Sequence, residues 1–212
     1  AERLKSLQDE KHHIFRLGGD EFVIVSKVNS IEEIKNDGIR AVEIFKEKFI
    51  LEDKFSVKIT GSIGASIYPQ DGTDIDKIIK YADIAMYESK CNGGNSLYLF
   101  NDTLKKEFYE KATIEKEVKN AIENSELYLE YQPQVSAKDG KIRGVEALLR
   151  WKNDRLGIVP PDKFIPIAEE SEVILEIDKW VISEVCKVIR MLQDEGYNNI
   201  TISANVSAKH FV

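Results

Sequence analysis

The stretch Arg16-Leu17-Gly18-Gly19-Asp20-Glu21-Phe22 places two glycines and two carboxylates between apolar runs at residues 13–17 and 22–25. Apolar runs separated by a short glycine-containing segment are typical of a β-hairpin, so we expect two strands joined by a four-residue tip at residues 18–21. Glycine lets the backbone approach a ligand closely, and adjacent acids offer oxygen ligands to Mg²⁺. The tip is therefore a candidate phosphate and metal site, and a solvated turn is the alternative.

Patterns downstream of the tip complete an α/β unit. Ser30 and Glu33 form a capping box, which predicts a helix from residue 30 to about residue 49. Alternating side chains over residues 57–67 predict one half-buried strand, followed by a turn at residues 69–72. Apolar residues at helical spacing predict a further helix that begins near residue 75 and ends near Gly93.

A second candidate site lies in Gly144-Val145-Glu146-Ala147-Leu148-Leu149-Arg150-Trp151. Strand alternation puts Glu146, Leu148 and Arg150 on one side of this strand. Glu146 and Arg150 are about 13 Å apart by strand rise, too far for a good salt bridge, so each is expected to face its own partner. A metal for Glu146 and a phosphate for Arg150 would fit, and an exposed sheet face is the alternative.

The rest of the second half reads as a strand-rich unit behind a charged connecting helix. We expect that helix at residues 102–124, strands at 127–131 and 142–151 joined by a turn at 138–141, a helix at 171–195 and a strand at 200–207. On the last strand Asn205 shares a polar face with Ser203, which would line a water-filled site or, as the alternative, lie exposed to solvent. Inside a barrel, Asn205 could add a neutral oxygen ligand to the metal that Glu146 holds.

Composition excludes several classes of function. Hydrophobic residues make up 42% of the 212 residues and charged residues 32%, which suits a globular core and not a disordered chain. The net charge of −7 argues against binding nucleic acid or anionic lipid. No apolar run reaches the roughly 18 residues of a membrane span. Cys91 and Cys186 form no disulfide framework, so we expect a cytoplasmic protein. If its parent is attached to a membrane, we expect the attachment to be made by a region absent from this chain.

The first half of the chain, about residues 1–101, resembles the GGDEF family, which makes cyclic di-GMP from two GTP. The resemblance is carried by residues 16–22, 62–65, 68–69 and 82–87, and by Lys90 with Gly93-Gly94-Asn95. It implies a ferredoxin-like, palm-type antiparallel sheet with helices. The implied site residues are Gly18 and Gly19 at the GTP phosphates, Asp20 and Glu21 in metal binding and catalysis, and Lys90 at the phosphate tail.

One stretch and one single position in this half depart from the GGDEF pattern. The family often carries Arg-x-x-Asp, an inhibitory product site, where this chain has Asp9-Glu10-Lys11-His12. Gly94 stands where an arginine is usual. Together with the absence from this chain of the family's first half, these differences make us expect that the GGDEF unit is regulatory.

The second half, about residues 113–212, is similar to the EAL family of cyclic di-GMP phosphodiesterases. The similarity is carried by Tyr131-Gln132-Pro133-Gln134, residues 146–151, residues 164–169 and Asn205-Val206-Ser207. It implies the first part of a TIM-like barrel that hydrolyses cyclic di-GMP to linear pGpG with Mg²⁺ or Mn²⁺. It also implies that Glu146 and Asn205 are metal ligands, that Glu146 is catalytic, that Arg150 contacts a substrate phosphate and that Gln132 lies in the substrate cleft.

The two resemblances together predict a division into a GGDEF part at residues 1–101, a linker helix at 102–125 and an EAL part at 126–212. We expect the parent protein to be a cyclic di-GMP phosphodiesterase, and the 212-residue chain alone to be inactive because a barrel of this type needs about 250 residues. A cyclic di-GMP receptor without turnover, and a parent with cyclase activity on GTP, stay open as alternatives. Open sheet edges in partial domains also lead us to expect a homodimer.

Overall fold

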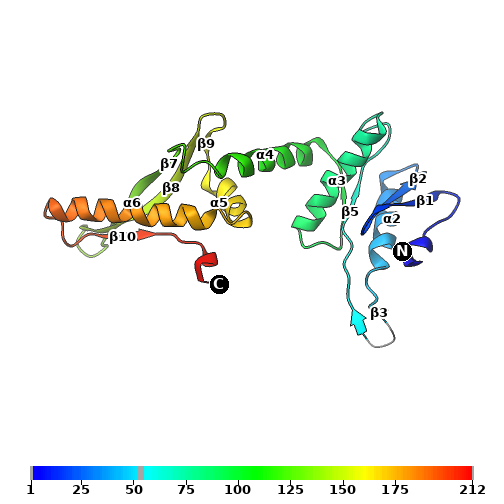
Figure 1. Cartoon of the computed structure of the whole chain (residues 1–212), viewed down its shortest axis with the longest axis horizontal. Helices are drawn as coiled ribbons and strands as arrows, with labels where there is room; N and C mark the ends of the chain where they lie inside the picture. Colours follow the sequence, from blue (N-terminus) through cyan, green and yellow to red (C-terminus); the bar gives the residue numbers. More distant parts are fainter. Residues whose placement is uncertain (1, 52–54, 212) are drawn as a thin grey trace. The chain divides into compact units, whose positions relative to one another are not determined.

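The computed structural model describes residues 2–51 and 55–211, which fold into two compact units that divide between Phe108 and Tyr109. The division falls within helix α4 (Asp102–Val118), in the stretch for which the sequence predicts a connecting helix. The narrower boundaries at residues 101 and 125 stay a prediction. Among the described residues, no helix is long and apolar enough to cross a bilayer. Both units contain helices and strands, which confirms the α/β class (Figure 1).

The first unit combines small sheets with two long helices. Its described strands form three two-stranded sheets, in which β1 pairs with β2 and β3 with β4 in antiparallel fashion, and β5 pairs with β6 in parallel. In chain order the elements are α1 (Glu2–Lys5), β1 (His12–Gly18), β2 (Glu21–Ser26), α2 (Ile31–Glu43), β3 (Phe49–Leu51), β4 (Phe55–Val57), β5 (Ile63–Ala65), α3 (Ile75–Cys91) and β6 (Leu97–Leu99).

Helix α2 begins as predicted and ends earlier than predicted. The Ser30 hydroxyl accepts the backbone N–H of Glu33 at 3.2 Å, which confirms the capping interaction. The predicted end near residue 49 is wrong, because the helix ends at Glu43 and Phe49 begins a strand. The Arg3 guanidinium donates to three carbonyls between residues 44 and 48 and lies 3.9 Å from the centre of the Phe49 ring. The first of these carbonyls, that of Ile44, is at the C-cap of the helix, and the other two belong to the segment that leads to Phe49.

The single strand predicted over residues 57–67 is also wrong. Val57 pairs with Phe49, whereas Ile63 pairs with Leu97, so the two ends of the stretch join different sheets. Residues 58–62 between them lie in no strand. The predicted turn at residues 69–72 and the helix after it are confirmed, the helix as α3.

Helix α3 packs directly onto β5 at Gly64. A Cβ atom at this position would lie 2.0 Å from the carbonyl oxygen of Ala82 and 2.1 Å from the backbone nitrogen of Met86. Only glycine allows the helix backbone to approach the strand so closely. The Ser62-Ile63-Gly64-Ala65 and Ala82–Tyr87 segments, far apart in the sequence, are therefore two halves of one packing contact.

The second unit is a four-stranded sheet with helices packed on one face. Strand β8 is central, with β7 antiparallel on one side and β10 parallel on the other, and β9 also pairs with β8. Among the described residues the sheet is open and does not close into a barrel. Its elements are β7 (Leu127–Val135), β8 (Ile142–Asn153), β9 (Gly157–Val159), α5 (Pro161–Glu170), α6 (Ile174–Asp194), β10 (Thr201–Ala204) and the 3₁₀ helix η1 (Ala208–Phe211).

Sequence patterns anticipate most of this unit and miss part of it. The strand predicted over residues 200–207 is wrong in extent, because β10 ends at Ala204 and leaves Asn205 outside it. The helix predicted over residues 171–195 is α6, which begins only at Ile174 because α5 ends at Glu170 and a turn separates the two. Helix α5 and the short β9 were not predicted. Helix α4 ends at Val118, short of the predicted residue 124, and the chain continues in turns to residue 125.

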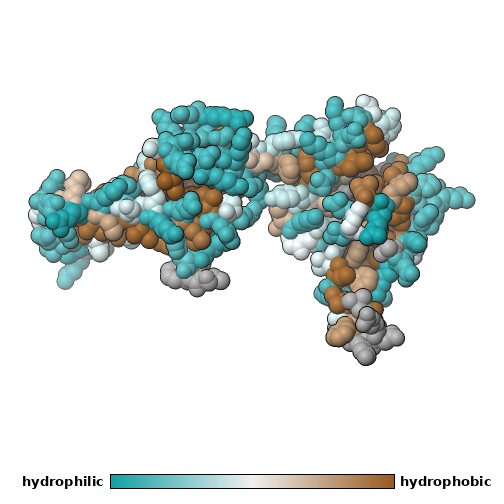
Figure 2. Space-filling model, in the orientation of Figure 1, coloured by the Kyte–Doolittle hydropathy of each residue, from teal (hydrophilic) through white to brown (hydrophobic). Residues whose placement is uncertain are grey.

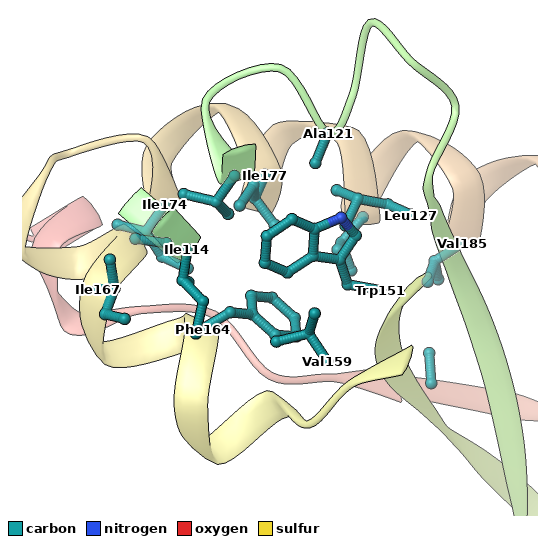
Figure 3. Close-up of a cluster of buried hydrophobic side chains, with 14 residues drawn as sticks. Ile114, Ala121, Leu127, Trp151, Val159, Phe164, Ile167, Ile174, Ile177 and Val185 are labelled. Carbon is teal, nitrogen blue, oxygen red and sulfur yellow. The ribbon is translucent and has the colours of Figure 1, made fainter. Parts of the chain in front are cut away.

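A hydrophobic core fixes the sheet of the second unit against its helices. Figure 3 shows the ring of Trp151 beside Phe164, with their centres 5.3 Å apart in an edge-to-face arrangement. Both side chains are fully buried, and Ile177 of α6 packs in the same cluster. The Trp151 indole donates to the Glu126 carboxylate at 2.9 Å, which satisfies its one polar atom. Figure 2 shows hydrophobic residues that also reach the surface in both units.

Candidate functional site

The two faces of β8 differ in the way that strand alternation predicts. Ala147 and Trp151 are buried in the core, whereas Glu146 and Arg150 on the opposite face are half-buried. The neighbouring strands continue this polar face, because Gln132 of β7 and Ser203 of β10 both pair with Glu146. The helices pack against the other face, and Gln132 and Ser203 on the polar face are exposed.

The structure brings Glu146 and Asn205 together. The side-chain amide of Asn205 donates to Glu146 Oε1 at 3.0 Å, although the two residues are 59 positions apart in the sequence. Gln132 lies directly across the ladder from Glu146. Three of the predicted site residues therefore lie next to one another, each supplied by a different strand or by the segment that directly follows one.

The chemistry of this group suits a hard divalent cation. Glu146 carries a carboxylate and Asn205 an amide oxygen that a turn of the amide group would bring toward the carboxylate. Among the described residues, no group of three or more His, Cys, Asp or Glu side chains could hold a metal ion. Mg²⁺ takes about six oxygen ligands, so these two side chains fit the ion in type and would supply part of its coordination.

Arg150 has a partner that sequence reasoning missed. Its Nε donates to Glu130 Oε2 at 2.7 Å, and its Nη1 donates to the Leu149 carbonyl at 3.0 Å. Tyr128 lies opposite Arg150 in the ladder, so Glu130 reaches it diagonally. The prediction that Arg150 and Glu146 face different partners agrees with this geometry. Alternation along β7 places Glu130 and Gln132 on the same face, which is the signal that could have found the pair.

The segment after Asn205 is held by two acids that sequence reasoning did not select for the site. The Ser207 hydroxyl donates to Glu169 Oε1 at 2.7 Å, and the Ser207 backbone N–H donates to Asp178 Oδ2 at 3.0 Å. Glu169 lies on α5 and Asp178 on α6. The chain beyond β10 is thus fixed to both helices that cover the sheet.

The hairpin tip of the first unit is tighter than predicted. Gly18 and Glu21 still pair in the ladder, which leaves a two-residue turn of Gly19 and Asp20 where a four-residue tip was expected. Gly19 has a φ of 50°, and the Arg16 guanidinium donates to its carbonyl at 2.7 and 3.1 Å. Both carboxylates and both glycines of the tip are exposed.

Lys90 lies in the last turn of α3, and its side chain is exposed. Within residues 2–51 and 55–211, no hydrogen bond or ion pair joins Lys90 to the hairpin tip. The structure therefore brings Glu146, Asn205 and Gln132 together in the second unit. In the described part of the first unit, Lys90 makes no hydrogen bond or ion pair to the glycines and acids of the tip.

The buried side chain of His12 lies between two more exposed acids in the first unit. Its Nε2 lies 2.9 Å from Asp37 Oδ2, and its Nδ1 lies 2.7 Å from Asp9 Oδ1. Carboxylates only accept hydrogen bonds, so this arrangement favours the positively charged imidazole, in which both ring nitrogens donate. The hydrogen bonds to Asp37 and Asp9 raise the pKa of His12, and the hydrogen bond from His12 lowers the pKa of Asp9. The interpretation of His12 as structural agrees with these contacts.

Comparisons with known proteins match each half separately. Residues 1–96 match the family model of the diguanylate cyclase GGDEF domain, and residues 115–212 match that of the EAL domain. Over 211 residues the chain is 33% identical to the bifunctional diguanylate cyclase/cyclic di-GMP phosphodiesterase MucR of Pseudomonas aeruginosa. This match covers 100% of this chain and 31% of MucR. It is 30% identical over 210 residues to the cyclic di-GMP phosphodiesterase NbdA of the same organism, and this match covers 99% of this chain and 27% of NbdA.

One solved structure with a related sequence is the PaMucR phosphodiesterase in complex with c-di-GMP. It is 38% identical to this chain, with a TM-score of 0.45, and the match covers 47% of this chain and 40% of that one. The chain spans less than a third of the length of the curated relatives named above.

Proposed function

This chain belongs to the family of tandem GGDEF–EAL proteins, and from that premise we propose that the protein at its full natural length hydrolyses cyclic di-GMP to linear pGpG. The names of MucR and NbdA, which both include cyclic di-GMP phosphodiesterase, support this choice of substrate. We place the reaction in the cytoplasm, where guanine nucleotides are made and used.

The observation that carries the proposal is the contact between Asn205 and Glu146. A carboxylate on a strand and an amide on the adjoining segment meet at 3.0 Å on the open polar face of the sheet. We propose that both bind one Mg²⁺ or Mn²⁺ ion through oxygen, and that Glu146 is the catalytic carboxylate. Such an ion supplies stabilisation of charge on a phosphoryl oxygen and a water molecule that is nucleophilic at neutral pH.

The neighbouring side chains are suited to hold the dinucleotide. Gln132 lies across the ladder from Glu146 and offers both a donor and an acceptor to a substrate group. Arg150 offers a planar guanidinium that matches two phosphate oxygens, and we propose that it exchanges Glu130 for a substrate phosphate. These two residues would orient the phosphodiester over the Glu146–Asn205 pair.

The test is turnover by the full-length protein with Mg²⁺ and cyclic di-GMP, followed by chromatography. We expect pGpG to accumulate in the wild-type protein, and to be lost in Glu146→Gln and Asn205→Ala. Tight binding of cyclic di-GMP with no pGpG formed would contradict hydrolysis and favour the receptor alternative.

The hairpin tip supports a second candidate activity, the binding of GTP. The left-handed backbone at Gly19 and the exposed carboxylates of Asp20 and Glu21 form a turn that a nucleotide phosphate and its Mg²⁺ could approach. We propose Gly18 and Gly19 as phosphate contacts, Asp20 as a metal ligand and Glu21 as catalytic, with Lys90 at the phosphate tail. In this scheme the GGDEF unit senses GTP and regulates the EAL unit, and cyclic di-GMP made from GTP by the full-length protein would show cyclase activity instead.

We also propose that the protein is a homodimer. One face of the β1–β2 hairpin carries Phe15, Leu17 and Val25, each at least half exposed, and apolar side chains gathered on one face favour association. Light scattering on the full-length protein is expected to give twice the monomer mass. A monomer at micromolar concentration would contradict this proposal.

A further inference from the structure

Asn205 lies just beyond the ladder that carries the rest of the site. Strand β10 ends at Ala204, and residues 205–207 have no regular secondary structure. The parallel pairing with β8 likewise ends at Ala204, opposite Ala147. Ladder hydrogen bonds therefore do not reach the backbone of Asn205, and contacts made farther along the chain help to fix its position.

The nearest such contacts are at Ser207, two residues after Asn205. Asp178 Oδ2 accepts the Ser207 backbone N–H at 3.0 Å, and the same oxygen lies 3.4 Å from His210 Nε2. The Ser207 hydroxyl is held separately by Glu169. Of the two acids, Asp178 is the one that binds the backbone of Ser207, whose carbonyl also accepts the His210 N–H at 3.2 Å within the same segment. Asp178 therefore ties the path of the chain near Asn205 to helix α6.

Asp178 is buried to an extent that is unusual for a carboxylate. It is 3% exposed and lies on the face of α6 that also buries Ile174, Ile177 and Val181 in the core. A carboxylate in such surroundings is costly unless it is hydrogen-bonded. Its partners, Ser207 and His210, both belong to the segment that follows β10. The side chain thus joins a rigid helix to the one part of the Glu146–Asn205 site that lies outside the sheet.

We propose that Asp178 is a positioning residue that holds Asn205 in place to share a metal ion with Glu146. The inference rests on the proposed function. The added claim is that the affinity for the metal ion depends on the Asp178 side chain, which touches neither the ion nor the substrate. A hydrogen bond is lost once its donor and acceptor separate beyond about 3.5 Å, so a shift of about half an ångström at Asn205 would break its present contact with Glu146. Groups that orient metal ligands commonly contribute about ten- to a hundredfold in metal affinity.

The test is calorimetric titration of Mn²⁺ alone into the full-length protein, without nucleotide. Asp178→Leu fills a similar volume and removes the acceptor, and we expect its dissociation constant for Mn²⁺ to rise by about tenfold or more. Asp178→Asn keeps an oxygen that can accept the Ser207 N–H, so we expect affinity within about threefold of the wild type. Glu176→Ala, an exposed change on the same helix, is the matched control and should bind as the wild type does.

A double-mutant cycle separates positioning from general stabilisation of the fold. If Asp178 acts through Asn205, Asp178→Leu will weaken Mn²⁺ binding in the wild type and will have little further effect in Asn205→Ala. Equal losses in both backgrounds would overturn the inference, as would wild-type affinity in Asp178→Leu.

Should Asp178→Leu fail to fold, Ser207→Pro removes the N–H donor from the other end of the same bond, and Ser207→Ala is its control. Weaker Mn²⁺ binding in the proline variant than in the alanine variant supports the inference, and equal binding overturns it. No Mn²⁺ binding by the wild-type protein would overturn the proposed metal site, and with it this inference. Binding that does not respond to Asp178→Leu or Ser207→Pro would overturn this inference alone.

Discussion

Replacement of Glu130 by glutamine should strengthen the binding of cyclic di-GMP, because Glu130 occupies the guanidinium that we assign to a substrate phosphate. Arg150 Nε and Glu130 Oε2 are 2.7 Å apart, and 26% of the Arg150 side chain and 55% of the Glu130 side chain are exposed. Ion pairs this exposed are worth about 0.2 to 1 kcal/mol, which Arg150 must give up before it can bind phosphate. Removing the competing charge should therefore lower the KM for cyclic di-GMP by about 1.4- to 5-fold.

The assay is initial-rate hydrolysis by the full-length protein over a range of cyclic di-GMP concentrations at low ionic strength. The advantage of Glu130→Gln should shrink as salt is added, because exposed charges are screened. Glu123→Gln, an exposed acid in the turn after α4, is the control for loss of one negative charge. Arg150→Ala should raise the KM by about tenfold or more, since hydrogen bonds to charged groups contribute about 1.5 to 3 kcal/mol. A higher KM in Glu130→Gln would refute competition and indicate that Glu130 holds Arg150 ready for the substrate.

Three further predictions concern stability, each measured by urea unfolding of the unit concerned. The carboxylates that flank His12 raise its pKa, so the stability that His12 contributes is present below about pH 6.5, while the acids stay ionised, and is lost as the pH rises through the raised value. His12→Asn should remove this dependence, and an unchanged pH profile would contradict the ion pairs. Gly64→Ala should cost about 1 to 3 kcal/mol because helix α3 must move, whereas Gly72→Ala, whose added Cβ meets only ordinary contacts, should cost little. Trp151→Phe should cost about 1 to 3 kcal/mol by leaving the Glu126 carboxylate without its indole donor, and no measurable loss would argue against that bond.

Sequence patterns are most informative where the local periodicity and the tertiary contacts agree. The alternation from Glu146 to Arg150 predicts which side chains share the polar face, and the structure confirms that face and places Asn205 beside Glu146. The capping interaction at Ser30 is confirmed for the same reason, since it involves residues only three positions apart. In these cases the deciding hydrogen bonds join residues that are close in the sequence, or the face of each side chain follows from the two-residue repeat of a strand.

The features that were missed depend on contacts between distant residues. Arg3, more than 40 positions away, donates to the carbonyl of Ile44 at the end of α2 and to two carbonyls just beyond it, and no local pattern announces these bonds. The partner of Arg150 requires the exact register of β7 on β8, because Glu130 reaches it diagonally. Helix α5 contains Pro166, a residue that normally interrupts a helix, so periodicity alone did not reveal it.

The most direct measurement is the rate at which the full-length protein and its Glu146→Gln variant convert cyclic di-GMP to pGpG in the presence of Mg²⁺. Glutamine keeps the size of the side chain and removes the charge that we assign to the metal, so the rate should fall by about a hundredfold or more. Glu195→Gln, an exposed change at the end of α6, should keep the wild-type rate. Undiminished pGpG formation by Glu146→Gln would contradict the assignment of this site.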